Sequence, residues 1–148
     1  MHSQSPQVAI VTGGATGIGF GIAEALAKAG LRVAIGSRRN DVVEQAANQL
    51  RAAGNPEVIG LPLDVTDRTS VEDFVDQVRK RWERIDILVN AAGVNIKNRT
   101  IGQMQPQQWD DVMAINATGA YNMIHATLPE MRARHSLSLI HISEPTRR

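Results

Sequence analysis

Cysteine is absent from the 148 residues, and aromatic side chains account for only 3% of them. The lack of cysteine excludes disulfides and thiolate chemistry, and it favours a cytoplasmic location. The 16 Lys and Arg residues nearly balance the 15 Asp and Glu residues. No excess of positive charge therefore attracts the chain to nucleic acid or to an anionic membrane.

Long apolar runs are also missing, since no stretch approaches the roughly 20 residues needed to cross a membrane. The first residues, Met1–Pro6, lack the basic and apolar regions of a signal peptide. The histidines show no metal-ligand spacing (His2, His125, His135 and His141). The sequence therefore predicts one soluble domain that binds no metal, membrane or nucleic acid.

Glycine, by contrast, stands at informative positions. The apolar run Val8–Val11 leads directly into Thr12–Gly19, where Gly13, Gly17 and Gly19 form the pattern Gly-x-x-x-Gly-x-Gly. Gly13 permits a sharp turn, Gly17 leaves space for a ligand beside the backbone, and Gly19 permits close packing of a helix on a strand. A helix that begins here offers unpaired N–H groups to a phosphate. The alternative is a glycine-rich turn that binds nothing.

Short segments rich in Val, Ile and Leu alternate with segments of helical periodicity. The expected strands are Gln7–Val11, Leu31–Ile35, Val58–Leu63 and Ile85–Val89, and the expected helices are Gly17–Ala29, Asp41–Ala53 and Ser70–Trp82. Ser70 and Asp73 are spaced as a capping box, and Gly30 and Gly54 follow the first two helices as C-cap glycines. This alternation predicts an α/β fold with a parallel sheet, whose carboxyl edge carries the glycine turn.

Three later motifs extend the pattern: Asp64-Val65 after the third strand, Asn90-Ala91-Ala92-Gly93 after the fourth, and Asn116 in a helical segment. With the glycine turn, they resemble the short-chain dehydrogenase/reductase family in order and spacing, from about Gln7 to Arg134. The resemblance implies a Rossmann-like, doubly wound parallel sheet, truncated here after about the fourth or fifth strand. It implies a parent oxidoreductase that interconverts a small-molecule carbonyl and an alcohol and forms a homo-oligomer.

The resemblance also assigns cofactor contacts to the motifs. It implies that the glycine turn binds the cofactor through Gly13, Ala15, Thr16, Gly17, Ile18 and Gly19. Asp64 would accept a hydrogen bond from the adenine amino group, with the Val65 backbone along the ring. The alternative for Asp64 is an aspartate that only caps a helix or closes a turn.

The resemblance places the cofactor's ribose over the backbone of Asn90, Ala91, Ala92 and Gly93, and gives Asn116 a water of the proton relay. In the family this asparagine also kinks its helix locally. The residues alone equally permit a glycine turn that merely ends a strand, and an Asn116 that bonds its own helix backbone.

The end of the second strand indicates which cofactor is bound. A carboxylate there holds a free 2′-hydroxyl, whereas a 2′-phosphate needs a cation. Here the stretch is Ser37-Arg38-Arg39, and the nearest acid, Asp41, is placed to start the next helix. Because a guanidinium can grip a phosphate bidentately, we expect NADP(H) rather than NAD(H), with Arg38 as the main contact. The alternative is a solvated pair of surface arginines.

The catalytic residues implied by the resemblance are a Ser, a Tyr that acts as general acid/base and a Lys four residues after it. The single tyrosine is Tyr121, and the residue four positions later is His125. We expect Tyr121 to be a packing residue. Asn116 is then the one catalytic-relay residue present, and the chain as written is expected to be inactive.

The last residues, Leu137–Arg148, resemble a one-frame translation of a transposon-end sequencing adapter. We therefore expect residues 1–136 to be an incomplete NAD(P)-binding domain and 137–148 to be an artefactual tail. Ser143, which falls near the family's serine position, is rejected as a catalytic residue. Two other hypotheses stay open: a non-catalytic nucleotide-binding protein, and an α/β domain that binds no nucleotide.

Overall fold

A computed structural model describes residues 5–97, 100–135 and 138–142. Five parallel strands form one sheet in the order β3-β2-β1-β4-β5. The strands are β1 (Val8–Thr12), β2 (Arg32–Ser37), β3 (Val58–Pro62), β4 (Ile87–Asn90) and β5 (Ser138–His141). The helices are α1 (Gly17–Lys28), α2 (Asn40–Ala52), α3 (Arg68–Trp82), α4 (Pro106–Met113) and α5 (Gly119–Ala133), and a π-helical turn, η1 (Ala114–Thr118), joins the last two.

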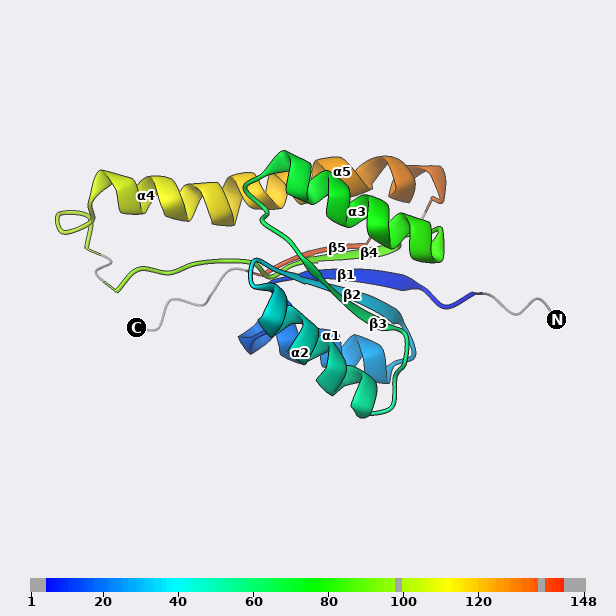
Figure 1. The fold of residues 1–148 in the computed structure, drawn as a ribbon. Coiled ribbons are helices and arrows are strands. Elements are labelled where there is room, and N and C mark those ends of the chain that lie inside the picture. Colours follow the sequence, from blue (N-terminus) through cyan, green and yellow to red (C-terminus); the bar gives the residue numbers. More distant parts are fainter. Residues whose placement is uncertain (1–4, 98–99, 136–137, 143–148) are drawn as a thin grey trace.

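The sheet is covered on both faces, as the doubly wound fold predicts (Figure 1). Helices α1 and α2 lie on one face, and α3 and α5 on the other. The side chains of β1 alternate between two apolar clusters: Ile10 packs in the cluster that contains Phe74 of α3, and Val11 in the cluster that contains Ala23 of α1. This two-sided burial explains why β1 is an unbroken apolar run. The Rossmann-like α/β fold is confirmed.

The helix ends differ in one respect from the expectation. The third helix starts at Arg68, and Asp67 caps it by accepting a hydrogen bond from the Thr69 N–H. The predicted capping box of Ser70 and Asp73 is therefore wrong. Ser70 instead accepts a hydrogen bond from the Asp64 N–H, 2.9 Å away, and so fixes the turn after β3. The glycines after α1 and α2 do adopt positive φ, as C-cap glycines should.

The segment around Asn116 is one long helix with an irregular turn. Helix α4 runs into η1 and then α5 without a break in the chain direction (Figure 1). π-Helical turns occur mostly as single turns within α-helices and are frequent at functional sites. Asn116 lies at the centre of this one. The irregular turn stands where the family resemblance implied a local kink.

At the amino edge of the sheet, a charged residue is completely buried. Asp86 precedes β4, has no exposed surface, and accepts hydrogen bonds from the Val8 N–H at 2.8 Å and from two nitrogens of Arg84 at 2.7 and 2.8 Å. Burial on its own raises the pKa of Asp86, but the hydrogen bonds from Arg84 and Val8 outweigh it, so the pKa lies below its ordinary value. A third Arg84 nitrogen donates to the Ser5 carbonyl.

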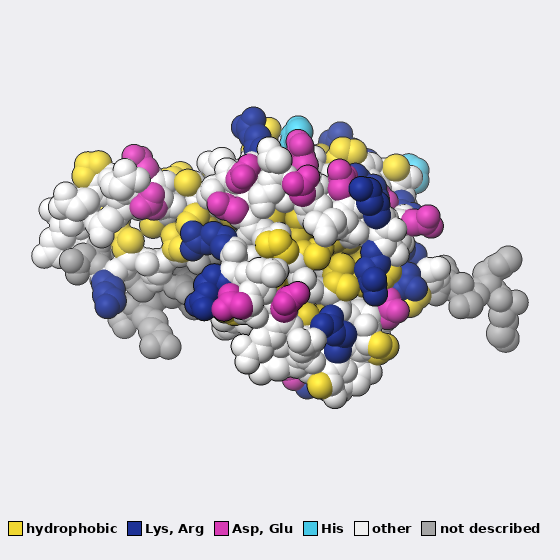
Figure 2. Space-filling view, viewed as in Figure 1, with side chains coloured by type: hydrophobic (Ala, Val, Ile, Leu, Met, Phe, Trp, Pro, Cys, Tyr) yellow, Lys and Arg dark blue, Asp and Glu magenta, His cyan; other side chains and the backbone are white. Residues whose placement is uncertain are grey.

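Acidic and basic side chains are interspersed over the face that carries α3, without a patch of one sign (Figure 2). None of the helices in the described part of the chain is long and apolar enough to cross a membrane. Among the same residues, no group of three or more His, Cys, Asp and Glu side chains could hold a metal ion.

Candidate cofactor-binding site

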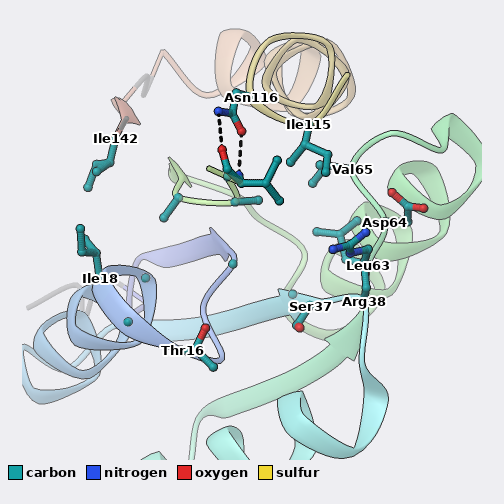
Figure 3. Close-up of a pocket in the computed structure, with 18 of the residues that line it drawn as sticks. Thr16, Ile18, Ser37, Arg38, Leu63, Asp64, Val65, Ile115, Asn116 and Ile142 are labelled. Carbon is teal, nitrogen blue, oxygen red and sulfur yellow. Dashed lines mark hydrogen bonds between the residues drawn. The ribbon is translucent and has the colours of Figure 1, made fainter. Parts of the chain in front are cut away.

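A cavity of about 330 Å³ opens at the carboxyl edge of the sheet (Figure 3). The turns after β1, β2, β3 and β4 form it, together with η1 and the end of β5. The predicted residues that line it are Gly13, Thr16, Gly17, Ile18, Gly19, Ser37, Arg38, Asp64, Val65, Ala91, Ala92, Gly93 and Asn116. Three predicted residues, Ala15, Arg39 and Asn90, are not part of the lining.

The glycine turn has little room for side chains. Gly13 has a φ of +64°, and a Cβ on it would lie 2.8 Å from the Ala91 carbonyl oxygen. A Cβ on Gly19 would overlap the Gly13 carbonyl oxygen, so Gly19 packs closely against the turn itself and not against a strand as predicted. Gly17, with a φ of +58°, has no atom within 4 Å of its Cβ position. Its backbone therefore faces open space, as the sequence pattern predicted.

Helix α1 begins at the cavity with nothing to neutralise its end. Thr16 is the N-cap residue, and the first turn holds no acidic residue. The first intrahelical bond is donated by Phe20 to the Thr16 carbonyl, so the N–H groups of Gly17, Ile18 and Gly19 precede the helical bonding pattern. These groups and the helix dipole favour an anion at this end of the cavity.

The two arginines after β2 have different surroundings. Arg39 forms an exposed ion pair with Asp41 at 3.4 Å, two residues away. Arg38 lines the cavity and has no hydrogen bond or ion pair to any residue that the structure describes (Figure 3). The strand end itself, Gly36-Ser37, carries no carboxylate. The cavity therefore has one guanidinium free to meet an anion.

Asp64 and Val65 line the cavity at the end of β3 (Figure 3). The Asp64 carboxylate closes a turn, because its Oδ1 accepts from the Thr66 N–H at 3.0 Å and from the Thr66 hydroxyl at 2.7 Å. No described group bonds its Oδ2, so that oxygen can still accept a hydrogen bond from a ligand. Asp64 therefore closes a turn, as the alternative held, but it uses only one of its two carboxylate oxygens for this.

The backbone after β4 is held by side chains from two other elements. The hydroxyl oxygen of Thr12 accepts from the Ala91 and Ala92 N–H groups at 3.2 and 3.1 Å. The amide of Asn116 accepts from the Val94 N–H at 2.9 Å and donates to the Val94 carbonyl at 3.1 Å (Figure 3). Asn116 therefore does not bond its own helix backbone, and that alternative is wrong. It joins η1 to the wall of the cavity.

Asn90 ends β4, is only 3% exposed, and is not among the residues that line the cavity. Its Nδ2 has no hydrogen-bond partner among the described residues. The strand ends at this position meet in register, because Thr12 lies opposite both Gly36 and Asn90.

The lining also contains residues that the sequence analysis did not assign to the site: Gly36, Leu63, Val94, Ile115, His141 and Ile142. Gly36, Leu63, Val94 and Ile115 each adjoin a predicted site residue, so proximity in the chain was the available signal. His141 lies opposite Asn90 in the β4–β5 register. Residues 137 and 143–148 of the expected tail, including Ser143, lie outside the described residues.

Tyr121 lies away from the cavity. It is 55% exposed on α5, and its ring is 5.7 Å from that of His125. Tyr121 therefore packs beside His125 on the surface of the helix and is not part of the buried core. Tyr121 has no place in the lining of the cavity.

The sequence pattern of the family described as short chain dehydrogenase matches residues 7–145. The chain belongs to the short-chain dehydrogenase/reductase family. Its similarity to other family members covers most of its own length. It is 37% identical over 139 residues to a glycine betaine reductase of Emericella nidulans and 33% identical over 144 residues to a short chain dehydrogenase of Monascus ruber, with 94% of this chain covered in each case.

A solved family member has nearly the same fold. The crystal structure of a metagenomic short-chain oxidoreductase in complex with NADP is 32% identical in sequence, with a TM-score of 0.86 and 95% of this chain covered. The chain spans only part of each of these proteins: 11% of the Emericella reductase, 48% of the Monascus dehydrogenase and 63% of the metagenomic chain.

Proposed function

We propose that this chain is the cofactor-binding part of an NADP(H)-dependent oxidoreductase that interconverts a carbonyl and an alcohol by hydride transfer. The observation that carries the cofactor preference is Arg38, a guanidinium at the cavity without a described partner, beside a strand end that has no carboxylate. A 2′-phosphate would supply the missing counter-charge. A free 2′-hydroxyl would leave Arg38 unused and would find no acidic partner.

The remaining lining offers a group for each part of a dinucleotide. The N–H groups at the start of α1 would bind the pyrophosphate, next to the open space at Gly17. The free oxygen of Asp64 would accept from the adenine amino group. Ala91, Ala92 and Gly93 would allow the ribose of the nicotinamide half to lie close to the backbone. When bound, NADP(H) would accept or supply the hydride.

Asn116 has a positioning role in this proposal. Its two hydrogen bonds to Val94 fix the backbone at the nicotinamide end, within an irregular helical turn. The family's proton relay would start here. The chain contains no Tyr with a Lys four residues later, so the 148 residues alone should bind cofactor without transferring hydride. We further propose a cytoplasmic homo-oligomer that acts on a small-molecule substrate.

The two arginines provide a test of the cofactor preference. Replacing Arg38 with Ala should weaken NADPH binding roughly tenfold or more, which corresponds to the loss of a charge-assisted contact of about 1.5 kcal/mol or more, and should change NADH binding little. The matched control is Arg39→Ala, since Arg39 is paired with Asp41 outside the cavity. Titration of both cofactors by fluorescence measures the effect. Tighter binding of NADH than NADPH by the unmodified chain would refute the proposal.

A non-catalytic nucleotide-binding protein is a second candidate. Most of the predicted cofactor contacts line the cavity, whereas the exposed Tyr121 lies outside it. A cavity that could bind a nucleotide but has no tyrosine in its lining favours this candidate. The gene sequence beyond the codon for Ser136 separates the two candidates. Continuation into a Tyr-x-x-x-Lys motif would support the oxidoreductase and an adapter origin for residues 137–148. A native stop codon near Arg148 would support the second candidate.

A further inference from the structure

Asn122 is not among the proposed cofactor contacts, but it bonds the backbone of Val65, which lines the cavity. It lies on α5 and is 5% exposed. Its Nδ2 donates a hydrogen bond of 2.9 Å to the Val65 carbonyl, 57 residues earlier in the chain. Its Oδ1 is buried and has no partner among the described residues. The side chain thus uses its donor and leaves its acceptor unpaired.

That unpaired acceptor is costly for a residue whose role is only to stabilise the fold. A buried polar atom without a partner loses its hydration and gains nothing in return. A well-packed apolar side chain would avoid this loss at a position inside the helix–sheet interface. The geometry of Asn122 is better explained by what its donor holds, which is the backbone of a residue that lines the cavity.

The turn that contains Val65 is fixed on its other side by local bonds. The Asp64 N–H donates to Ser70, and the Asp64 carbonyl accepts from the Asp67 N–H at 3.1 Å. Both partners lie within the same turn and the start of α3. The hydrogen bond from Asn122 joins Val65 to a separate element, α5, so it helps to set how far this turn lies from α5.

Gly119 brings α5 close enough for that bond. A Cβ on Gly119 would lie 2.5 Å from Cγ2 and 3.0 Å from Cβ of Val65. The absence of a side chain at Gly119 therefore lets α5 approach the turn, and the Asn122 amide then holds it. One residue sets the contact distance and the other supplies the bond.

We propose that Asn122, together with Gly119, is a positioning residue for the adenine end of the cofactor site. By fixing the Val65 carbonyl, it orients the Asp64–Val65 backbone against which an adenine ring would lie. This inference rests on the proposed function, since it takes the adenine half of NADP(H) as the ligand of that turn. It predicts that a change at Asn122 affects one half of the cofactor and not the other.

The test titrates the full chain with two half-cofactors, adenosine 2′,5′-bisphosphate and nicotinamide mononucleotide, by calorimetry. Asn122→Leu removes the donor and the unpaired acceptor and keeps the number and branching of the side-chain heavy atoms. It should weaken the bisphosphate roughly fivefold, as expected for one lost positioning hydrogen bond, and leave the mononucleotide unchanged. Thr127→Val is the matched control, because Thr127 is equally buried on α5 but bonds only the Met123 and Ile124 carbonyls of its own helix.

Gly119→Ala tests the same turn without touching the amide, and should weaken the bisphosphate selectively by pushing Val65 away. Equal weakening of both half-cofactors by Asn122→Leu, or no weakening of either, would overturn the positioning role. Failure of the unmodified chain to bind the bisphosphate would overturn the proposed function as well, so the two failures are distinguishable. Thermal unfolding of each variant shows that the folded protein was titrated.

Discussion

The buried Asp86 at the amino edge of the sheet and the polar side chains at its carboxyl edge differ in how they are paired. At the amino edge, both carboxylate oxygens of Asp86 accept hydrogen bonds from Arg84, and one also accepts from the Val8 N–H. At the carboxyl edge, Arg38 and the Nδ2 of Asn90 have no partner within the described part of the chain. Asp86 precedes β4, and Asn90 ends it four residues later. We therefore interpret the amino edge as stabilising and the carboxyl edge as the proposed binding edge.

This separation has a physical basis. Strand ends are where a sheet can expose backbone groups, and in parallel α/β folds ligands bind at the carboxyl ends. A buried polar group without a partner lowers stability, whereas a bound ligand can supply that partner. The hydrogen bonds of Asp86 at the amino edge stabilise the fold, and the unpaired side chains at the carboxyl edge are available to a ligand. Variants at the two edges should therefore have different effects on unfolding and on binding.

The largest effect is expected at the amino edge. Asp86→Ala removes the partner of Arg84 and the acceptor of the Val8 N–H, so it should lower the free energy of unfolding by about 3 kcal/mol or more. The cavity residues lie at the far edge, so the folded variant should bind NADPH as the unmodified chain does. Urea unfolding monitored by circular dichroism, and an NADPH titration at low temperature, measure the two quantities.

An exposed ion pair serves as the control for that substitution. Asp76 pairs with Arg79 at 3.0 Å, and its side chain is 57% exposed. Asp76→Ala should cost less than about 0.5 kcal/mol, because water screens such a pair. If Asp76→Ala and Asp86→Ala lowered the free energy of unfolding by similar amounts, the comparison would fail, because the buried pair would then stabilise the fold no more than an exposed one.

Acid should weaken the same edge by a smaller amount. The folded pKa of Asp86 lies below the ordinary value of 3.8, so its stabilising contribution is complete above that pH. The contribution is then lost as the pH falls through the lower, folded value. Asp86→Asn should remove this part of the acid dependence. Unfolding free energies measured between pH 6 and pH 2.5 check the prediction, and identical pH profiles for the two proteins would contradict it.

The carboxyl edge was largely predictable from the sequence, because its determinants are local. A buried strand, a glycine turn and a helix follow one another within Val8–Gly19, and Gly13 and Gly17 adopt the positive φ that such a turn needs. Arg38 directly follows β2 and Asp64 follows β3 by two residues, and both line the cavity. Ala15 and Arg39 lie near strand ends as well but are not part of the lining.

The amino edge and the helix contacts were not predictable in this way. Asp86 meets Val8 across 78 residues, and Asn122 meets Val65 across 57, so both partnerships depend on the packed fold. Ser70 resembles a helix cap by spacing, but Asp67 takes that position and Ser70 bonds the neighbouring turn. Asn90 fits a site motif, but it is buried and is not part of the lining. Spacing along the chain does not show which polar groups meet in space.

A small effect on stability and a clear effect on binding are expected at Gly17. Its φ is +58° and its Cβ position is open, so Gly17→Ala meets no steric clash and should cost only about 1 kcal/mol of unfolding free energy. The added methyl group would occupy the space where the pyrophosphate approaches the backbone. NADPH binding should therefore weaken tenfold or more, by about 1.4 kcal/mol or above, in a fluorescence titration.

Gly30 provides the matched control, because its φ is also positive but it lies at the other end of α1. It follows α1 with a φ of +87°, has no atom within 4 Å of its Cβ position, and does not line the cavity. Gly30→Ala should therefore cost a similar unfolding free energy and leave NADPH binding unchanged. Equal weakening of NADPH by both variants would mean that backbone strain alone lowers affinity. Loss of affinity with Gly17→Ala only would mean that the open space at the carboxyl edge is where the cofactor lies.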